Sequence, residues 1–362
     1  LEGRDREKPF LLMLHHKAPH RNWMPAIRHL GLYADRQIPT PATFGDDYAG
    51  RPAARLADMR IEDMYLSLDM KLHAEAYGEE TGTGGHPTWN PTDSWEEAYG
   101  RMTEEERALW DAHYDPINRA FAEDRPEGEA LARWMYRRYL EDYLASIAAV
   151  DEGVGRVLDF LEAEGLAEDT VVVYTSDQGF YLGEHGWYDK RFMYEESLGT
   201  PLVVRYPKAI AAGRESEELV ANLDIAPTLL DFAGVEIPEG MQGASLRPLL
   251  EGATLAEGSE WRDAFYYRYY EYPHGWHSVL PHYGIRTKAH KLIHFEGDPT
   301  KGIAPYRELF DLEADPHEVA NRYGDPELAE LQAGLERRLA ELQAELGDTP
   351  EGVIEMATSP EP

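Results

Sequence analysis

The chain has 362 residues, of which 43% are hydrophobic and 11% aromatic. This composition is typical of a globular protein, and the length favours one large domain accompanied by a smaller one. The 35 basic residues against 68 acidic ones leave a formal net charge of −33, which argues against nucleic acid and anionic membranes as partners. The chain has no cysteine, so disulfides cannot indicate its compartment, and no apolar stretch is long enough to span a membrane.

The first half of the chain alternates strands and helices. Residues 10–16 are apolar and predict a buried strand, and residues 53–77 and 104–121 have the pattern of helices. Apolar residues recur at helical spacing from 129 to 164, which predicts a long amphipathic helix packed on a sheet.

Two short apolar runs then predict buried strands at residues 170–175 and 201–206. Strands that alternate with helices indicate an α/β sheet with crossover connections.

The pattern changes after about residue 250. Tyrosine-rich alternating runs at 264–271, 283–287 and 291–295 predict an antiparallel sheet. A final helix is predicted to begin at Asp325 as N-cap, with Pro326 in its first turn. Its leucines recur every three or four residues, which favours a helix that covers the small sheet over a coiled coil.

The most informative segment follows the strand at 170–175. Asp177 and Gln178 stand at its carboxyl end, the edge where open α/β sheets bind ligands. Both side chains offer oxygen donors, which a divalent cation such as Ca²⁺ prefers. Lys190 follows in a glycine-rich loop, close enough along the chain to return its ammonium to the same site as an anion clamp.

This segment resembles the metal-and-lysine motif of the sulfatases in the alkaline-phosphatase-like superfamily. Residues 15–25 resemble the family's histidine motif, in which the histidine after proline, here His20, contacts the sulfate ester. Residues 222–230 resemble the helix after the last strand of the catalytic sheet. Three such blocks in family order are a strong signal.

The resemblance implies an α/β fold: an alkaline-phosphatase-like α/β/α sandwich, truncated at its N-terminus, with a smaller C-terminal α+β domain. We expect residues 1–250 to be a partial catalytic domain, residues 251–346 a C-terminal subdomain and residues 347–362 a disordered tail.

The resemblance also implies the chemistry. Asp177 and Gln178 would be ligands of one Ca²⁺ ion, although glutamine stands where many relatives carry asparagine or histidine. Lys190 would hold a sulfate oxygen, and its alternative is a solvated loop lysine. His20 would act as general acid for the leaving alcohol, and its alternative is a histidine held by turn backbone.

The family's nucleophile has no counterpart in this sequence. It is a formylglycine made from the first residue of a Cys/Ser-x-Pro/Ala-x-Arg motif, and the nearest match, at residues 51–55, begins with Arg51. Asp46 and Asp47 follow a loop sequence and are interpreted as a solvated turn rather than as metal ligands. We therefore expect the formylglycine in a segment upstream of this chain, and the isolated chain to be inactive.

Further residues are weaker candidates. His185 would either contact substrate or hold its loop, and Arg191 is expected to be structural. The segment 272–287 resembles the small-domain region of bacterial N-acetylglucosamine-6-sulfatases and related glycan sulfatases. There His282 and Arg286 are candidates for substrate contact. Core packing is expected of the other three candidates in this segment, Trp276, His277 and Tyr283.

The sequence thus predicts a Ca²⁺-dependent sulfatase that acts on sulfated carbohydrates, periplasmic or extracellular by resemblance. Two alternatives stay open. One is a phosphoric-ester or phosphonate hydrolase of the same superfamily. The other is a non-catalytic relative, either carbohydrate-binding or non-functional.

Overall fold

A computed structural model describes residues 1–78, 91–252, 261–272 and 277–348. The chain forms two compact units: Leu1–Pro39 with Ile61–Phe160, and Thr40–Arg60 with Leu161–Pro362. Across the described ranges, no helix has both the length and the apolar character of a membrane span. The predicted disordered tail lies almost wholly outside these ranges, and so does Trp276.

Helices dominate the first unit. Its long helices are α3 (Pro91–Gly100), α4 (Glu104–Asp124) and α5 (Gly128–Ala163), and its short ones are η1 (Ile27–His29), η2 (Ile61–Asp63) and α2 (Ala74–Tyr77). The helices predicted at 104–121 and 129–164 are confirmed by α4 and α5. Thr103 and Glu106 form a capping box that sets the start of α4.

Aromatic side chains make the core of this unit. Trp110 packs between Trp95 and Tyr114, with ring centroids 5.8 and 4.6 Å away. Tyr65 and Leu68 complete the buried cluster. Offset aromatic contacts of this kind contribute beyond the area they bury.

Residues 10–16 do not form the predicted strand. The side chains of this run are largely exposed, 73% for Leu11 and 66% for Met13. Backbone groups in a strand need a neighbouring strand to bond with, and no described strand pairs with this run. The apolar pattern identified a segment suited to a strand, but the prediction is wrong for this structure.

The helix predicted at 53–77 is also wrong. The segment contains only α1 (Pro52–Leu56), η2 and α2, separated by turns. Lys71 has a φ of +58°, which no helix interior accommodates. The buried Asp69 carboxylate accepts a hydrogen bond from the Tyr65 backbone N–H at 2.8 Å, so side-chain bonding replaces the helical ladder here.

The second unit contains the remaining predicted strands. Strands β1 (Val172–Thr175) and β4 (Leu202–Arg205) confirm the runs at 170–175 and 201–206, and they pair antiparallel. They are less buried than predicted, because Tyr174 is 44% and Val203 61% exposed. The pair has no third described strand beside it.

Short elements surround these two strands in the chain. η3 (Ala167–Asp169) precedes β1. Between β1 and β4 lie β2 (Tyr181–Leu182), η4 (Glu184–Gly186), β3 (Tyr188–Asp189) and α6 (Glu195–Leu198), and after β4 come η5 (Asn222–Asp224), α7 (Ile225–Phe232) and α8 (Arg247–Glu251). The helix predicted from the block at 222–230 is confirmed by η5 and α7.

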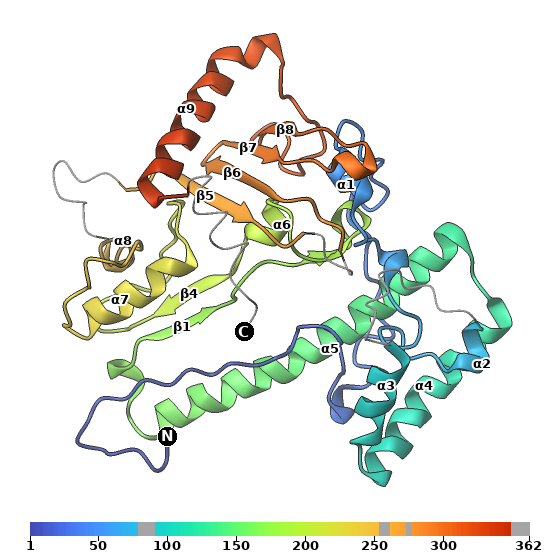
Figure 1. Ribbon diagram of the computed structural model, residues 1–362. Coiled ribbons are helices and arrows are strands. Elements are labelled where there is room, and N and C mark those ends of the chain that lie inside the picture. The colour runs from blue at the N-terminus through green and yellow to red at the C-terminus, as the bar shows by residue number, and fades with distance from the viewer. Residues whose placement is uncertain (79–90, 253–260, 273–276, 349–362) are drawn as a thin grey trace, which may run out of the picture. The chain divides into compact units, whose positions relative to one another are not determined.

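An antiparallel sheet of order β5-β6-β7-β8 follows (Figure 1). Its strands are β5 (Ala264–Tyr269), β6 (His282–Thr287), β7 (His290–Phe295) and β8 (Tyr306–Asp311), with η6 (Pro299–Lys301) before the last. Three of them confirm the tyrosine-rich runs, whereas β8 was not predicted.

The terminal helix covers this small sheet, as predicted. Asp325 accepts a hydrogen bond from the Glu327 backbone N–H and starts η7 (Pro326–Leu328), which leads into α9 (Ala329–Leu346). The leucine stripe of α9 packs on one face of the sheet, and the buried members of this cluster are Ala264, Ile285, Leu292, Leu309, Leu335, Leu339 and Leu342.

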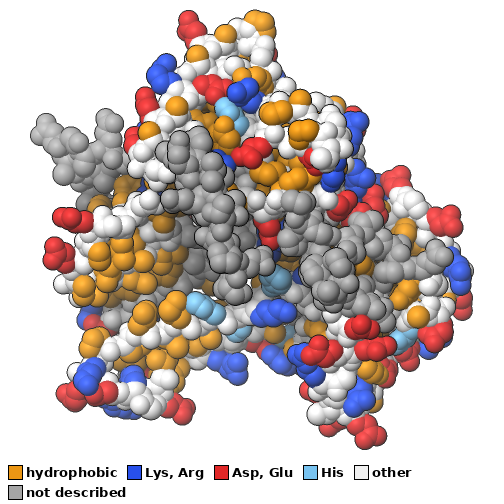
Figure 2. All heavy atoms as spheres, viewed as in Figure 1, with side chains coloured by type: hydrophobic (Ala, Val, Ile, Leu, Met, Phe, Trp, Pro, Cys, Tyr) orange, Lys and Arg blue, Asp and Glu red, His pale blue; other side chains and the backbone are white. Residues whose placement is uncertain are grey.

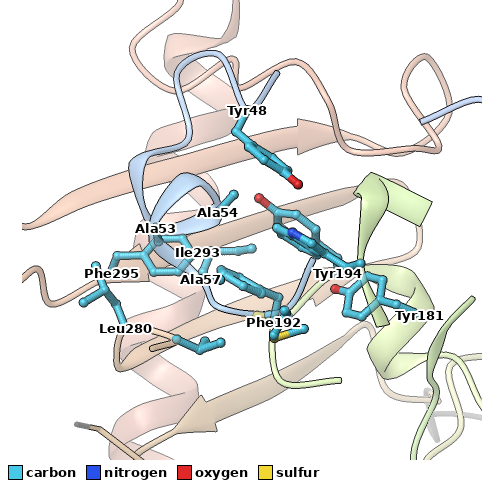
Figure 3. Close-up of a cluster of buried hydrophobic side chains, with 14 of the residues drawn as sticks. Tyr48, Ala53, Ala54, Ala57, Tyr181, Phe192, Tyr194, Leu280, Ile293 and Phe295 are labelled. Carbon is cyan, nitrogen blue, oxygen red and sulfur yellow. The ribbon is translucent and has the colours of Figure 1, made fainter. Parts of the chain in front are cut away.

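The opposite face of the sheet belongs to the main core of this unit, which Figure 3 shows. There Phe192 and Tyr194, from the loop after β3, meet Ile293 and Phe295 of β7. Trp187 stacks on Phe192 with centroids 4.7 Å apart. The loop that carries Lys190 therefore packs against the aromatic core through Phe192 and Tyr194.

Candidate active site

Asp177 and Gln178 follow the carboxyl end of β1, where the sequence places them. Asp177 is exposed, and its Oδ1 accepts a hydrogen bond from Ser176 Oγ at 3.2 Å. Asn222 Nδ2 donates to the Asp177 backbone carbonyl at 2.6 Å. The first residue of η5 thus fixes the backbone of the loop that carries both oxygen donors.

Gly179 fastens the same loop to α6. Its N–H donates to the Ser197 carbonyl at 2.9 Å. A Cβ at this position would stand 2.1 Å from the Glu196 carbonyl oxygen and 2.6 Å from that of Gly199. Only glycine fits such a close backbone approach, so the loop geometry depends on this residue.

The hairpin β2–β3 delivers Lys190. Tyr181 pairs with Asp189 across the hairpin, and the Tyr188 N–H donates to the Met59 carbonyl at 2.9 Å. Lys190 follows immediately and is only 8% exposed. It is therefore not a solvated loop lysine, which was the alternative interpretation.

Asp189 is the charged partner of Lys190. Its Oδ1 lies 3.3 Å from Lys190 Nζ. Its Oδ2 lies 3.4 Å from Arg191 Nη2 and 3.5 Å from His277 Nδ1. The sequence analysis missed Asp189, although an acidic residue directly before the candidate lysine was a signal that could have found it.

His185 holds its loop, the second of the two roles considered for it. It is fully buried, and its Nδ1 lies 2.6 Å from Asp46 Oδ2. Tyr48 Oη donates to its carbonyl at 2.6 Å. Burial lowers the pKa of His185 despite the hydrogen bond to Asp46, so the ring is neutral near pH 7 and Nδ1 carries the proton.

Asp46 is buried, so the prediction that it lies in a solvated turn is wrong. Its side chain is 4% exposed and forms an ion pair with Arg51, with Nη2 2.5 Å from Oδ1. Burial alone would raise the pKa of Asp46, but the hydrogen bonds from His185 and Arg51 prevail and lower it to about 2. Asp47 does occupy a turn, where its Oδ1 accepts from the Ala49 N–H.

His20 belongs to the first unit and is exposed. Its Nδ1 lies 2.8 Å from the Arg21 carbonyl oxygen, and because a carbonyl only accepts, Nδ1 must carry a hydrogen. This leaves Nε2 as the atom that can exchange a proton with a ligand. Arg21 itself is fixed by a two-armed ion pair with the buried Asp69, so the histidine loop has a firm anchor.

His282 and Arg286 are engaged within the fold. His282 is fully buried: Nδ1 donates to the Leu280 carbonyl at 2.8 Å, and Nε2 accepts from the Met193 N–H at 3.2 Å. Burial lowers its pKa to about 4. Both ring nitrogens are thus occupied, and the packing gives His282 the role of a core residue instead of a substrate contact.

Arg286 forms an ion pair with Glu195, with Nη2 2.9 Å from Oε2, and its Nη1 donates to the Thr287 carbonyl. The structure gives this guanidinium structural partners. Its contact with substrate stays a prediction.

Asp177 and Gln178 are the two candidate metal ligands. Among the described residues no group of three or more histidines, aspartates or glutamates is arranged to hold a metal ion. Asp177 and Gln178 offer the oxygen chemistry that suits a hard divalent cation, and the Asp177 carboxylate forms no ion pair in the described structure. Calcium takes six to eight oxygens, so these residues fit part of such a site.

Comparisons with known proteins agree on one family. The family model described as sulfatase matches residues 1–235, and the model described as the C-terminal region of N-sulphoglucosamine sulphohydrolase matches residues 183–345. An N-acetylglucosamine-6-O-sulfatase of Bacteroides thetaiotaomicron is 48% identical over 352 residues, which are 96% of this chain and 60% of that protein.

Solved structures extend the comparison. One, a protein in complex with its substrate D-glucosamine-2-N,6-O-disulfate, is 47% identical with a TM-score of 0.87, over 96% of this chain and 68% of that one. A phosphonate monoester hydrolase of Agrobacterium radiobacter is 31% identical with a TM-score of 0.50, over 58% and 42% of the two chains. These likenesses confirm the predicted α/β fold class with a small C-terminal domain.

Proposed function

The chain belongs to the sulfatase family, and from this premise we propose that the whole protein hydrolyses sulfate esters on sulfated sugars of the N-acetylglucosamine 6-sulfate type. The chain spans 60% of the length of the similar N-acetylglucosamine-6-O-sulfatase, which is why the proposal concerns the whole protein. The single observation that supports it most is this 48% identity over 96% of the chain.

The geometry of the second unit supports the proposal. Two oxygen donors lie in the loop after β1, which Gly179 and Asn222 hold in place, and a nearly buried lysine follows the hairpin β2–β3. An ammonium that is preorganised in a largely water-excluded position stabilises negative charge far better than one in bulk water.

The family works with a divalent metal ion and a formylglycine. We propose Ca²⁺ as the ion and Asp177 and Gln178 as two of its ligands. When bound, the ion would neutralise sulfate oxygens and make the hydrated aldehyde more acidic. This chain has no cysteine, and its serines lie outside the required motif, so its own residues do the binding and the proton transfer.

Two residues carry those tasks in the proposal. Lys190 binds a sulfate oxygen as a compact cation. His20 gives the proton on Nε2 to the leaving sugar oxygen while Nδ1 stays bonded to the Arg21 carbonyl.

The test compares substrates on one preparation of the whole protein. We expect release of sulfate from 6-sulfated N-acetylglucosamine to be faster by orders of magnitude than hydrolysis of an aryl phosphate or a phosphonate monoester. Asp177→Ala should abolish the metal-dependent part of this activity. A dominant phosphonate or phosphate rate would contradict the proposal.

The second candidate is therefore a phosphonate or phosphoric-ester hydrolase. It is favoured by the likeness to the Agrobacterium radiobacter phosphonate monoester hydrolase, which covers 58% of this chain. The third alternative, a non-catalytic relative, would show no turnover in the same assay. A carbohydrate-binding relative would still bind sulfated sugar, whereas a non-functional one would not.

A further inference from the structure

Asp189 is the residue on which the cationic side chains of the lysine loop converge. Its carboxylate is nearly buried, 12% exposed, and faces Lys190 Nζ at 3.3 Å, Arg191 Nη2 at 3.4 Å and His277 Nδ1 at 3.5 Å. Arg191 Nη2 also donates to His277 Nε2 at 2.7 Å. Because Nε2 accepts this bond, His277 is neutral and carries its hydrogen on Nδ1, which lies 3.5 Å from Asp189 Oδ2.

The backbone around this cluster is unusual. Asp189 has a φ of +74° and Arg191 a φ of +125°, both in the region that side chains rarely adopt. Such conformations cost energy and persist only where the surroundings enforce them. Here the pairing of β2 with β3 and the stacking of Trp187 on Phe192 enforce these backbone conformations.

The cluster of Asp189, Lys190 and Arg191 has a net positive charge, which attracts anions. One carboxylate against Lys190 and Arg191 leaves a formal charge of +1, in a chain whose formal total is −33. Lys190 Nζ and Asp189 Oδ1 form an ion pair at 3.3 Å, and the ammonium of Lys190 has three N–H groups with which it can also bind a sulfate oxygen.

We propose that Asp189 is a positioning residue of the reaction: its Oδ1 holds the Lys190 ammonium in place through an ion pair, and its Oδ2 links that ion pair to Arg191 and His277. This inference rests on the proposed sulfatase function, in which Lys190 binds the sulfate group. A flexible lysine would otherwise have to be ordered anew in each catalytic cycle.

The test uses four forms of the whole protein: wild type, Asp189→Asn, Lys190→Ala and the double variant. For each we would measure kcat and KM on a sugar sulfate, and the dissociation constant of inorganic sulfate by calorimetry. The matched control is Asp169→Asn, which breaks the exposed ion pair with Lys208 near the other end of the β1–β4 pair. It should change each constant by less than about twofold.

Asp189→Asn should lower kcat at least about tenfold while inorganic sulfate binds as tightly as before, or up to about fivefold more tightly, because a negative charge has left the site. A folding defect cannot tighten binding, so this pairing of results separates positioning from a structural role. In the Lys190→Ala background the same substitution should change kcat less than about twofold.

Wild-type kcat in Asp189→Asn, or an equal fold-loss with and without Lys190, would overturn the proposal. If Asp189→Asn does not fold, Asp189→Glu serves instead, because it keeps the charge but displaces it; an intermediate kcat supports positioning, and an unchanged one refutes it.

If wild type releases no sulfate from any sugar, the proposed function fails. The affinities for inorganic sulfate still test whether Asp189 and Lys190 are coupled. If the double variant changes the dissociation constant by the product of the two single changes, within about twofold, the coupling is refuted. A deviation from that product of about fivefold or more supports it.

Discussion

Single polar contacts determine which atoms of the candidate site can act. The Arg21 carbonyl leaves Nε2 as the ring nitrogen of His20 that can exchange a proton, and Asp189 forms an ion pair with Lys190. In His185 the same kind of contact, with Asp46, holds a buried histidine as a structural residue. The identity of the partner, more than the residue type, separates an acting side chain from a supporting one.

The role of His20 gives the first residue-scale prediction. His20→Ala in the whole protein should reduce kcat on a sugar sulfate by about 10²–10⁴-fold, because a poor leaving alcohol needs a proton. An activated aryl sulfate, whose phenolate leaves unaided, should lose far less. Steady-state rates on both substrates check this, and equal losses would mean that His20 only positions the sulfate.

Glu308 supplies a pH-dependent term in stability. It is fully buried in β8, and it accepts hydrogen bonds from Tyr194 Oη at 2.8 Å and Tyr306 Oη at 2.9 Å. Burial raises its pKa to about 7, although both hydroxyl donors act to lower it. Between pH 4.5, the ordinary value, and pH 7 the folded state therefore binds more protons than the unfolded state.

Stability contributed by this group is thus present at low pH and lost as pH rises through that window. We expect Glu308→Gln to flatten the fall in the free energy of unfolding between pH 5 and 8, a term of up to about 3 kcal/mol. Urea unfolding at several pH values measures it, with the exposed Glu330→Gln as control. A slope identical to wild type would show that Glu308 stays ionised.

At the scale of elements, the sequence predicted those whose signal is local. The helices α4, α5 and α9 have regular apolar spacing and, in α4, a capping box, and they form where expected. The runs at residues 10–16 and 53–77 depend on distant partners, and there the predictions failed. Periodicity carries no information about whether a neighbouring strand or a buried ion pair is present.

The residues of the candidate site also fall into those that a local motif predicts and those that depend on contacts distant in the sequence. Asp177, Gln178 and Lys190 were predicted from a contiguous motif. They follow β1 and β3 in the fold, and their roles stay predictions. Asp46 and Asn222 act through contacts that only the fold creates, such as the 2.6 Å bond from Asn222 to the Asp177 carbonyl. Their roles could not be derived from spacing.

Packing of α9 on the small sheet gives the element-scale prediction. Leu339 is 2% exposed against Ile285, Leu292 and Leu309. Leu339→Ala should lower the free energy of unfolding by about 2–5 kcal/mol through lost burial and the cavity left behind. Urea denaturation checks this against Leu346→Ala, at a 40% exposed position of the same helix, which should cost far less. Equal losses in the two variants would contradict the packing described.

At the scale of the whole molecule, the negative net charge contrasts with the positive side chains of the loop that carries Lys190. Acidic side chains are spread over the face seen in Figure 2, in keeping with the formal charge of −33. The cations of the lysine loop are drawn inward, since Lys190 is 8% exposed. An anionic ligand would therefore have to be held by short-range contacts, because the long-range field of the chain repels anions.

The last prediction is that residues 1–362 alone release no sulfate. The nearest match to the formylglycine motif begins at Arg51, which is 1% exposed and ion-paired with Asp46 at the start of α1, so it offers no nucleophile. Without a covalent nucleophile the electrostatic groups that remain sustain at most a residual rate. The measurement is sulfate release from an aryl sulfate with Ca²⁺ added, beside the whole protein as positive control. Sustained turnover that disappears in Lys190→Ala would show that this chain supplies a nucleophile of its own.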